Sequence, residues 1–512
     1  MNTLTTESNY ILAYSPVSLI PTEFPKSKTV YTENEDSITL FEESRGTLVI
    51  LKDDITAGLW ENGVGGPLFT LEDLRTFLRE NTANFSPATG GSVAYGTNLF
   101  VNSVNGNDLT AEAGNPGKPY YSMAAAINYA YTAGATSTNR ILIYVVNGVY
   151  SPGFLTLVDF VDIYAEPGVL FSGAVQFTDG GTPRNSKIFG FARISASYTG
   201  QPVFHFRAAS NIFIEIDELL TPSTILLANL VTVGSSNIYI KANRIESTLT
   251  LGAAWAISLR NNTNVQLDIK EYIKANHSII ETRNRWTGKL LVNTPKLILT
   301  AANVYGGSYK QALIVYSAAA ESIIEINGNI YNETPTYLGS NSGLIVNWGS
   351  NQGKTFINGN IYAGAGIGVY SNNTGAGKLT VKGSIYSDLE AVLCTGIGLN
   401  IFRDGSIITS GDIYRNIYVN GSPKVYFINC NMYMGTANAN NILIESAAAT
   451  LSLYNCIGDT NGAAGEFLAS SLAVTVLLHN VISRKPLGAL VTNTLTLGPG
   501  FIQDPNLLTP QF

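Results

Sequence analysis

Charged side chains are scarce in this sequence: Asp, Glu, Lys and Arg make up 13% of its 512 residues, whereas 45% are hydrophobic. Soluble proteins usually carry about twice that share of charge. A chain that is disordered throughout has the opposite balance, so global disorder is excluded. The formal net charge of −7 offers no basic stripe to neutralise phosphates, which argues against nucleic acid as the main partner.

Cysteine and histidine are rarer still, with three residues of each type. Cys394, Cys430 and Cys456 form no CxxC pair and no Cys/His cluster, so neither a disulfide scaffold nor a zinc site is indicated. We expect three buried free thiols and histidines with structural roles. The sequence predicts no metal and no cofactor.

Export and membrane signals are missing as well. Residues 1–25 have no Lys or Arg ahead of an apolar stretch, which a secretory signal would have. No run approaches the roughly 20 apolar residues that are needed to cross a bilayer. We therefore expect no signal-directed export and no membrane insertion.

Residues 1–95 differ in texture from the rest and are expected to form a small α+β module. They contain much of the Glu and Lys and several prolines. Thr70 and Asp73 have the spacing of a helix N-terminal cap, and the apolar residues that follow repeat at helical spacing, at Leu71, Leu74, Phe77 and Leu78. Ala88–Gly96, with two adjacent glycines, is typical of a linker.

Residues 96–135 are predicted to hold the end of this linker, a strand at Phe100–Asn102 and a capping helix. Ser122 is placed to cap that helix and Gly134 to end it. Its apolar residues recur at helical spacing, at Met123, Ala126, Ile127 and Ala130. We expect the helix to cover one end of the structure that follows.

Residues 136–486 consist of short β segments that are self-similar. The segment Ile326-Asn-Gly-Asn-Ile-Tyr331 recurs at Ile357–Tyr362, Val381–Tyr386 and Thr409–Tyr414, so glycines 328, 359, 383 and 411 lie 31, 24 and 28 residues apart. Cys430 and Cys456 continue the series in the glycine position. A drifting period of about 20–30 residues is typical of a solenoid, and a parallel β-helix tolerates coils of variable length.

Two further features of the repeats suggest how the coils stack. Small residues at the glycine position suit a tight bend. Asparagines beside that position (Asn327, Asn358, Asn429 and Asn455) suit a ladder of side-chain amides between coils. The sequence thus predicts an all-β parallel β-helix over residues 136–486, with residues 487–512 as a C-terminal cap or subunit-contact segment.

Segments near the start of the β region resemble a known family. Val101–Asp108 followed by Gly117–Ile127 is similar to the beginning of pectin-lyase-like β-helices, where a GND…GKP(F/Y)…AA(I/L) stretch leads into a capping helix. Ile141–Tyr150 and Val161–Gly168 resemble the first coil of that superfamily. The resemblance implies a right-handed parallel β-helix of the bacteriophage tail spike or tail fibre type, which commonly carries a small N-terminal virion-binding module.

This resemblance implies a bacteriophage virion structural protein: a tail spike, tail fibre or capsid fibre assembled in the host cytoplasm. Residues 1–95 would attach to other virion proteins, and the β-helix rod would bind host cell-surface polysaccharide. The alternative on the same scaffold is a polysaccharide-degrading enzyme, that is, a depolymerase, lyase or glycosidase. A bacterial surface adhesin is disfavoured because no export signal is present.

Phage spikes of this type are trimers, so the resemblance also implies a parallel homotrimer. With so little charge, a narrow rod must expose apolar patches, and closed cyclic symmetry would bury them. We expect the interface to include part of residues 430–512, where Leu, Val and Ala dominate and charge nearly disappears.

An enzyme of this class needs paired carboxylates on neighbouring coils. The candidate pairs are Glu321 with Glu325, Asp388 with Glu390, and Asp404 with Asp412. Glu321 and Glu325 are an even number of positions apart and could share one strand face. Each of these acids is more commonly a solvated turn residue, so catalysis is not favoured.

Aromatic residues offer a binding alternative. Tyr331, Tyr362, Tyr386, Tyr414 and Tyr433 occupy equivalent repeat positions and would form a stripe, which stacks on sugars if it faces outward and packs in the core if it faces inward. The sequence leaves both orientations open. Trp255, Trp286 and Trp348 are better individual candidates for glycan contact, and burial of each in the core fits the sequence equally well.

Overall fold

The computed structural model describes most of the chain, in two compact units formed by Met1–Val93 and Ala94–Phe512. The described residues are 2–7, 10–14, 22–25, 30–33, 37–42, 46–62, 67–81, 95–151, 153–173, 176–178, 184–196, 202–206, 210–222, 224–229, 236–248, 255–276, 278–300, 313–315, 319–333, 343–410, 415–435, 440–460, 466–493 and 501–503.

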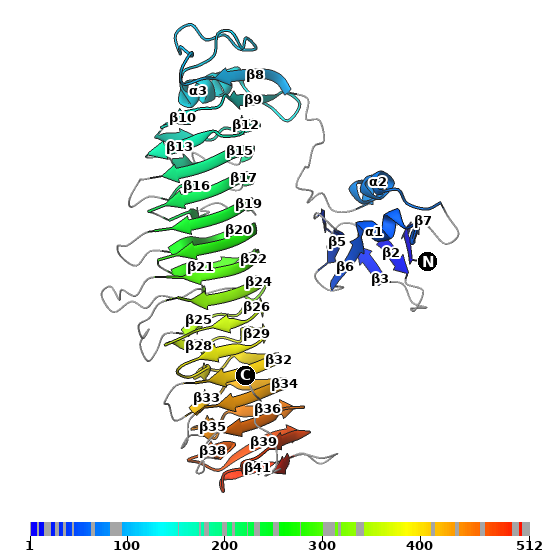
Figure 1. The fold of residues 1–512 in the computed structure, drawn as a ribbon, viewed down its shortest axis with the longest axis vertical. Helices are drawn as coiled ribbons and strands as arrows, with labels where there is room; N and C mark the ends of the chain where they lie inside the picture. Colours follow the sequence, from blue (N-terminus) through cyan, green and yellow to red (C-terminus); the bar gives the residue numbers. More distant parts are fainter. Residues whose placement is uncertain are drawn as a thin grey trace. The chain divides into compact units, whose positions relative to one another are not determined.

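The first unit combines two small sheets with two helices (Figure 1). One sheet has the order β3-β2-β1-β7 and the other the order β4-β5-β6. The elements are β1 (Asn2–Glu7), β2 (Tyr10–Tyr14), β3 (Thr22–Pro25), β4 (Val30–Glu33), β5 (Ser37–Glu42), β6 (Gly46–Leu51), α1 (Lys52–Thr56), β7 (Trp60–Asn62) and α2 (Leu71–Asn81). Their shared core includes Leu4, Phe24, Ile38 and Leu74.

Helix α2 begins where the sequence places it. The Asp73 backbone N–H donates to Thr70 Oγ1 at 3.1 Å, and the Thr70 N–H donates to Asp73 Oδ2 at 3.2 Å. This reciprocal arrangement satisfies two backbone donors at the start of the helix. The predicted cap is therefore confirmed.

The second unit starts with β8 (Tyr95–Val101) and α3 (Met123–Ala133). The Ser122 side chain accepts a hydrogen bond from the Ala125 N–H at 3.2 Å, and Gly134 follows the helix with a left-handed φ of 69°. The apolar side of α3 packs on the first coils and joins the main core. The predicted helix is confirmed, and it covers one end of the stacked strands (Figure 1).

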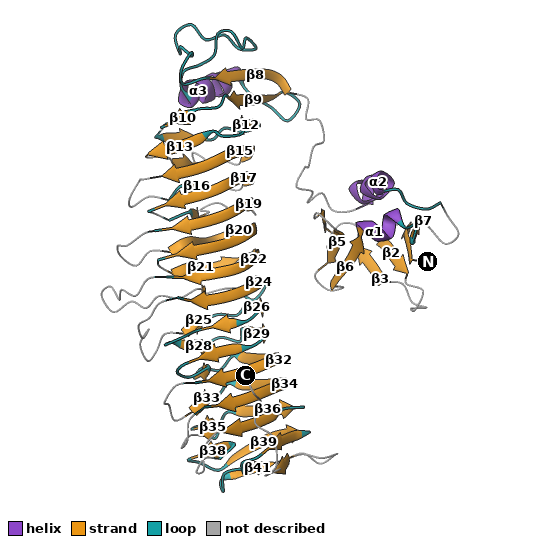
Figure 2. Ribbon diagram, in the orientation of Figure 1, coloured by secondary structure: helices purple, strands orange, loops and turns teal. Residues whose placement is uncertain are grey.

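The remainder is a parallel β-solenoid, in which 35 strands, β8 to β42, form one continuous sheet within the described residues (Figure 2). Its first half contains β9 (Arg140–Val145), β10 (Val149–Tyr150), β11 (Phe154–Thr156), β12 (Val161–Ala165), β13 (Leu170–Gly173), β14 (Gln176–Thr178), β15 (Arg184–Ala196), β16 (Phe204–Phe206), β17 (Ser210–Thr221), β18 (Leu226–Asn229), β19 (Ser236–Ser247), β20 (Trp255–Ala275), β21 (Ser278–Thr287), β22 (Lys289–Leu299), β23 (Leu313–Val315) and β24 (Ile323–Asn332).

Its second half contains β25 (Gly343–Gly349), β26 (Lys354–Asn358), β27 (Ile361–Tyr362), β28 (Ile367–Asn373), β29 (Lys378–Lys382), β30 (Ile385–Ser387), β31 (Val392–Cys394), β32 (Leu399–Thr409), β33 (Arg415–Val419), β34 (Lys424–Met434), β35 (Asn440–Ile444), β36 (Thr450–Tyr454), β37 (Ile457–Thr460), β38 (Leu468–Ser470), β39 (Val474–His479), β40 (Val481–Ser483), β41 (Val491–Asn493) and β42 (Phe501–Gln503).

Each middle coil presents three strand segments, and β24 shows how the first two are joined. Its residues Ile323–Asn327 pair with β26 and its residues Ile330–Tyr331 pair with β27, with a bend at Gly328 between them. We call the two resulting stacks the first face and the second face. The third face contains β16, β18, β21, β23, β25, β28, β31, β33, β35 and β38, with the start of β20 between β18 and β21.

Buried aliphatic and aromatic residues stack in register inside the solenoid. One first-face column contains Ile188, Ile214, Ile240, Leu267, Val292, Ile326, Ile357, Val381, Phe402 and Phe427, all buried. Because side chains alternate along a strand, the residues on either side of this column point outward. The outer surface is thus set by the register.

The register corrects one repeat assigned from the sequence. Gly405, and not Gly411, follows Gly383 at the bend, because Gly405 pairs with Cys430 and lies against the Gly383 carbonyl. Thr409 ends β32 opposite Ser387. Gly411 itself lies outside the described residues.

Candidate functional site

The carboxylates of the first candidate pair lie in different elements. Glu321 is exposed in the turn before β24, whereas Glu325 lies half-buried in β24 itself. Glu325 Oε1 accepts a hydrogen bond from Asn327 Nδ2 at 3.3 Å. The two acids therefore do not share one strand face, which corrects the expectation from their spacing.

Asp388 and Glu390 both lie between β30 and β31, but each has its own partner. Asp388 accepts a 2.6 Å hydrogen bond from Ser410 Oγ, and Glu390 accepts one of 2.7 Å from Arg415 Nε. The Arg415 guanidinium also lies 3.6 Å from the centroid of the Tyr418 ring. The negative charge of Glu390 is thus compensated by a cation, as in a structural ion pair.

Asp404 lies at the bend in β32 and has a left-handed φ of 55°. Asn429 Nδ2 donates to one of its oxygens at 2.9 Å and Arg403 Nε to the other at 2.8 Å. These hydrogen bonds hold the pKa of Asp404 below its ordinary value. Such a carboxylate stays ionised and is a poor general acid. Asp412, its expected partner, lies outside the described residues.

The three candidate tryptophans have different outcomes. Trp286 has no exposed surface, and its Nε1 donates to the Thr263 carbonyl at 3.0 Å. Burial therefore removes Trp286 from the candidate glycan contacts. Trp255 is half-buried at the start of β20. The side chain of Trp348 lies outside the described side chains.

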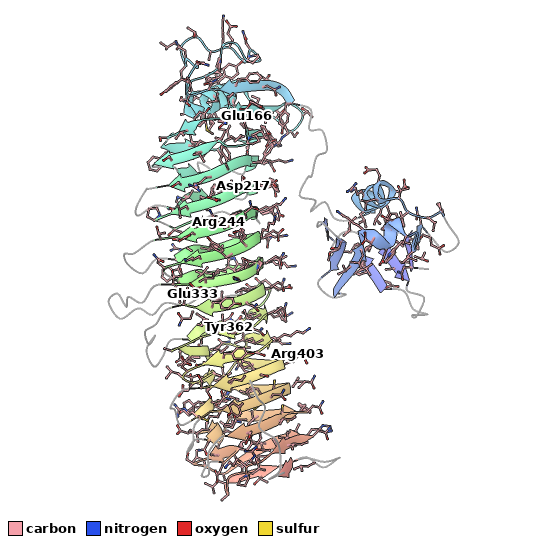
Figure 3. The ribbon with its side chains drawn as sticks, viewed as in Figure 1. Glu166, Asp217, Arg244, Glu333, Tyr362 and Arg403 are labelled. Atoms are coloured by element: carbon pink, nitrogen blue, oxygen red, sulfur yellow. The ribbon has the colours of Figure 1, made fainter. Side chains whose placement is uncertain are left out.

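The tyrosine stripe faces outward, because its rings alternate with the buried Ile330, Ile361 and Ile385. Tyr331 and Tyr362 stack with ring centroids 4.7 Å apart, and Tyr362 and Tyr386 with centroids 4.9 Å apart, in nearly parallel planes. Tyr362 can be seen among the coils in Figure 3. Tyr414 lies outside the described residues.

This stacking decides what the stripe can bind. A sugar packs on the face of an aromatic ring, but both faces of Tyr362 are covered by its neighbours in the stack. At the two ends of this tyrosine stack, Ile298 lies next to Tyr331 and Ile408 lies next to Tyr386 on the adjacent strands, and both isoleucines are nearly buried. The stripe consequently presents ring edges and hydroxyl groups and works chiefly as a structural ladder.

The predicted amide ladders are confirmed, and they belong to two separate columns. Asn358 Nδ2 donates to Asn327 Oδ1 at 2.8 Å on the first face. Asn455 Nδ2 donates to Asn429 Oδ1 at 3.2 Å at the bend, where both residues have left-handed φ angles. Asparagine tolerates that conformation better than most residues. The ladders therefore fix both the rung spacing and the bend.

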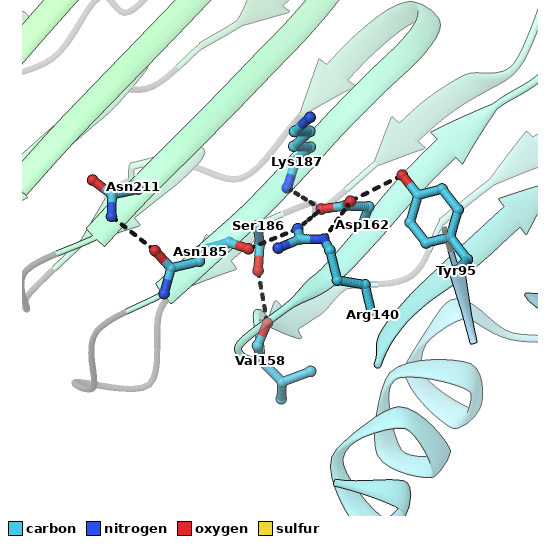
Figure 4. A network of polar contacts seen from close by, with 8 residues as sticks. All are labelled: Tyr95, Arg140, Val158, Asp162, Asn185, Ser186, Lys187 and Asn211. Carbon is cyan, nitrogen blue, oxygen red and sulfur yellow. Dashed lines mark hydrogen bonds and ion pairs between the residues drawn. The ribbon is translucent and has the colours of Figure 1, made fainter. Parts of the chain in front are cut away.

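A buried ionic network locks the start of the solenoid (Figure 4). Asp162 has no exposed surface and accepts hydrogen bonds from Tyr95 Oη at 2.9 Å, from Arg140 Nε at 3.1 Å and from the Lys187 N–H at 2.9 Å. Arg140 Nη2 contacts the same carboxylate and also donates to the Asn185 carbonyl at 2.8 Å. Desolvation and the neighbouring Asp162 raise the pKa of Tyr95.

Charge is divided unevenly between the two units. Residues 1–93 contain 13 of the 37 acidic and six of the 30 basic side chains, so they carry the whole formal charge of −7. Residues 94–512 balance 24 acidic against 24 basic side chains. The first unit also exposes four large aliphatic side chains, Val49, Leu51, Leu59 and Leu68.

In the early coils, opposite charges meet across the rungs. Lys241 Nζ lies 2.9 Å from Glu215 Oε1 on the first face. On the second face Glu218 binds two arginines, Arg193 at 2.6 Å and Arg244. These coils therefore neutralise their own surface charge.

Later coils on the first face are different. Their four segments, 354–358, 378–382, 399–403 and 424–428, contain five basic residues and no acidic residue; we call their outward side chains the basic face. The basic residues are Lys354, Lys378, Lys382, Arg403 and Lys424, all exposed or half-exposed, and Arg403 extends away from its strand (Figure 3). The four lysines form no ion pair with any described residue.

The described residues include neither a cluster of metal ligands nor a membrane-spanning helix. They contain no group of three or more His, Cys, Asp or Glu residues placed to hold a metal ion. Nor do they include a helix with the length and hydropathy of a membrane span. In comparisons with protein-family models, curated proteins and solved structures, no match to this chain was found.

Proposed function

We propose that the chain is a bacteriophage virion structural protein: a tail spike, tail fibre or capsid fibre. Its N-terminal unit attaches it to other virion proteins, and its solenoid presents a surface that binds host cell-surface polysaccharide. Assembly takes place in the host cytoplasm. The coils are right-handed, as in pectin-lyase-like β-helices, because connections between parallel strands are right-handed in about 98% of cases.

The observation that carries this proposal is that the two units differ in net charge and in exposed surface. A small acidic unit with exposed Val49, Leu51, Leu59 and Leu68 has the composition of a docking module. The solenoid is neutral overall and is capped by α3 at its first coils, so it suits a rod that displays a repetitive surface.

Deleting residues 1–93 tests the attachment role. The truncated chain should fold into a β-rich solenoid and be absent from particles purified after its expression in infected host cells, whereas the full chain is incorporated. Leu59→Asp should reduce incorporation, and Ile397→Asp, at a similarly exposed aliphatic residue of the solenoid outside residues 430–512, serves as its control. Normal incorporation of the truncated chain would contradict the assignment.

Binding is favoured over cleavage because Asp388, Glu390 and Asp404 each have a separate partner. Incubation with host-surface polysaccharide should therefore retain the protein on the polymer without releasing new reducing ends or unsaturated products. Release of such products would instead establish the polysaccharide-degrading enzyme.

The proposed assembly is a parallel homotrimer. Ile457, Ile482 and Ile502 follow one another on adjacent strands, and Ile457 and Ile502 are 38% and 44% exposed. Such a column suits a contact between copies. Native mass spectrometry should show three chains, and Ile457→Asp should dissociate them, whereas Ile397→Asp, in a turn outside this region, should not. A stable monomer at micromolar concentration would refute the trimer.

A further inference from the structure

We propose that the basic face binds an anionic polysaccharide, that is, a glycan polymer bearing carboxylate, sulfate or phosphate groups. This inference rests on the proposed glycan-binding function and names its ligand class. The observation behind it is that positive side chains face one another on adjacent rungs, an arrangement that does not stabilise a solenoid.

On the basic face, like charges occupy neighbouring rungs. Lys354 pairs with Lys378, and Lys382 pairs with Arg403, in register on adjacent parallel strands. Such strands are about 4.8 Å apart, and like charges directly opposite each other destabilise a sheet. The early coils place Glu215 opposite Lys241 on the same face, so this fold readily accommodates complementary charges.

Few acidic side chains of the protein itself lie near the basic face. Asp404 is the acid at its edge, and it is already engaged by Arg403 and Asn429. Glu325 lies one rung before the face, opposite Phe356. Arg403 and Lys382 thus share the carboxylate of Asp404, whereas Lys354, Lys378 and Lys424 form no ion pair with any described residue. A bound polyanion would reduce the repulsion that remains between these cations.

The layout suits an extended polymer. Lys354, Lys378 and, one rung further beyond Leu399, Lys424 form one edge of the face. Lys382 and Arg403 form another edge four residues along the strands, roughly 13 Å away. Between these edges runs a column of Phe356, Thr380, Ile401 and Tyr426, all half-buried. Apolar ring and aliphatic surface flanked by cations can contact both the sugar rings and the anionic groups of a polysaccharide.

A polysaccharide fits this surface better than a nucleic acid does. DNA carries one charge per about 1.7 Å of its length, so its phosphates would extend well beyond a face that spans three rung spacings, roughly 14 Å. The solenoid outside the basic face supplies no excess of positive charge, since the unit as a whole is neutral. A polymer with widely spaced anions avoids that mismatch.

The test uses the full-length protein and four immobilised polymers: hyaluronan for carboxylate, dextran sulfate for sulfate, teichoic acid for phosphate, and neutral dextran. We expect salt-sensitive binding to at least one anionic polymer and none to dextran. The double variant K378Q/K382Q should weaken that binding about tenfold. The matched control K270Q/K296Q removes two exposed lysines elsewhere and should leave binding unchanged.

A second variant separates binding from folding. Lys378→Glu places an acid opposite Lys354, so it should raise the denaturation midpoint while weakening polymer binding. A mere folding defect would lower both. The inference is overturned if no anionic polymer binds, if K270Q/K296Q is as damaging as K378Q/K382Q, or if single-stranded DNA binds more tightly through the same lysines. Retention on neutral host glycan alone would overturn it and leave the proposed function standing.

Discussion

Replacing Arg140 by alanine should loosen the first coils far more than an equivalent substitution elsewhere. The guanidinium supplies two of the donors to Asp162, which is fully buried. Removing one partner of a buried ion pair costs about 3–5 kcal/mol, because the other charge stays behind without compensation. Tyr95 Oη and the Lys187 backbone N–H would remain as donors, and the Lys187 ammonium, whose pKa burial lowers in spite of its electrostatic interaction with Asp162, would compensate only part of the buried charge.

Hydrogen exchange measured by mass spectrometry suits this prediction, since a solenoid can open locally while its other coils stay folded. Amides of β8, β9 and β12 should exchange roughly a hundred- to several thousandfold faster in Arg140→Ala. The control is Arg193→Ala, which removes an arginine paired with the more exposed Glu218 and should change nearby exchange less than about fivefold. Equal effects of the two substitutions would refute the reasoning.

Three other outcomes follow from single residues. Gly383→Ala should lower the free energy of unfolding in urea by about 1–3 kcal/mol, because a Cβ would lie 2.4 Å from the Gly359 carbonyl oxygen at a φ of 135°. Gly117→Ala is the control, and equal denaturation midpoints for the two variants would contradict this close packing. The hydrogen bond to Glu166 and burial raise the pKa of Tyr144 to about 12, so the stabilising contribution of Tyr144 should be complete below pH 10 and lost as the pH rises through 12. The absorbance of tyrosinate should detect this titration, and Glu166→Gln should lower its midpoint. An unchanged midpoint would count against the hydrogen bond. Burial raises the pKa of the Cys394 thiol to about 12, so an aromatic disulfide reagent should label it only after unfolding, and rapid labelling of the native protein would show that the coil opens.

Local features of the fold were predictable because they depend on short spacings. The caps at Thr70 and Ser122 are fixed within three residues, and the Asn327–Asn358 ladder follows from a six-residue repeat. The repeat after Gly383 was placed wrongly for an equally local reason. Asp404 adds a left-handed residue at the bend, so the glycine position moves to Gly405 and the Ser-Gly of residues 410–411 imitates it.

The surface was harder to predict because it depends on register. Lys354, Lys378 and Lys424 come together only when coils of unequal length are aligned, and the net charge of −7 concealed a neutral solenoid with a basic region. A usable signal was present in the segments KTFIN, KLTVK, LNIFR and KVYFI, each of which has a basic residue at one or both ends. The sequence left the burial of Trp286 open, because nothing local indicates that its ring packs inside and that its Nε1 donates to the Thr263 carbonyl.

The two kinds of charge column distinguish structural from functional demands on one fold. Where Glu215 faces Lys241, each rung stabilises the next, and any change weakens the stack. Where Lys354 faces Lys378, by contrast, the two neighbouring rungs repel each other, and a single acidic substitution would relieve this repulsion. The polyanion proposed for the basic face would relieve the same repulsion by supplying the missing negative charge from outside the chain.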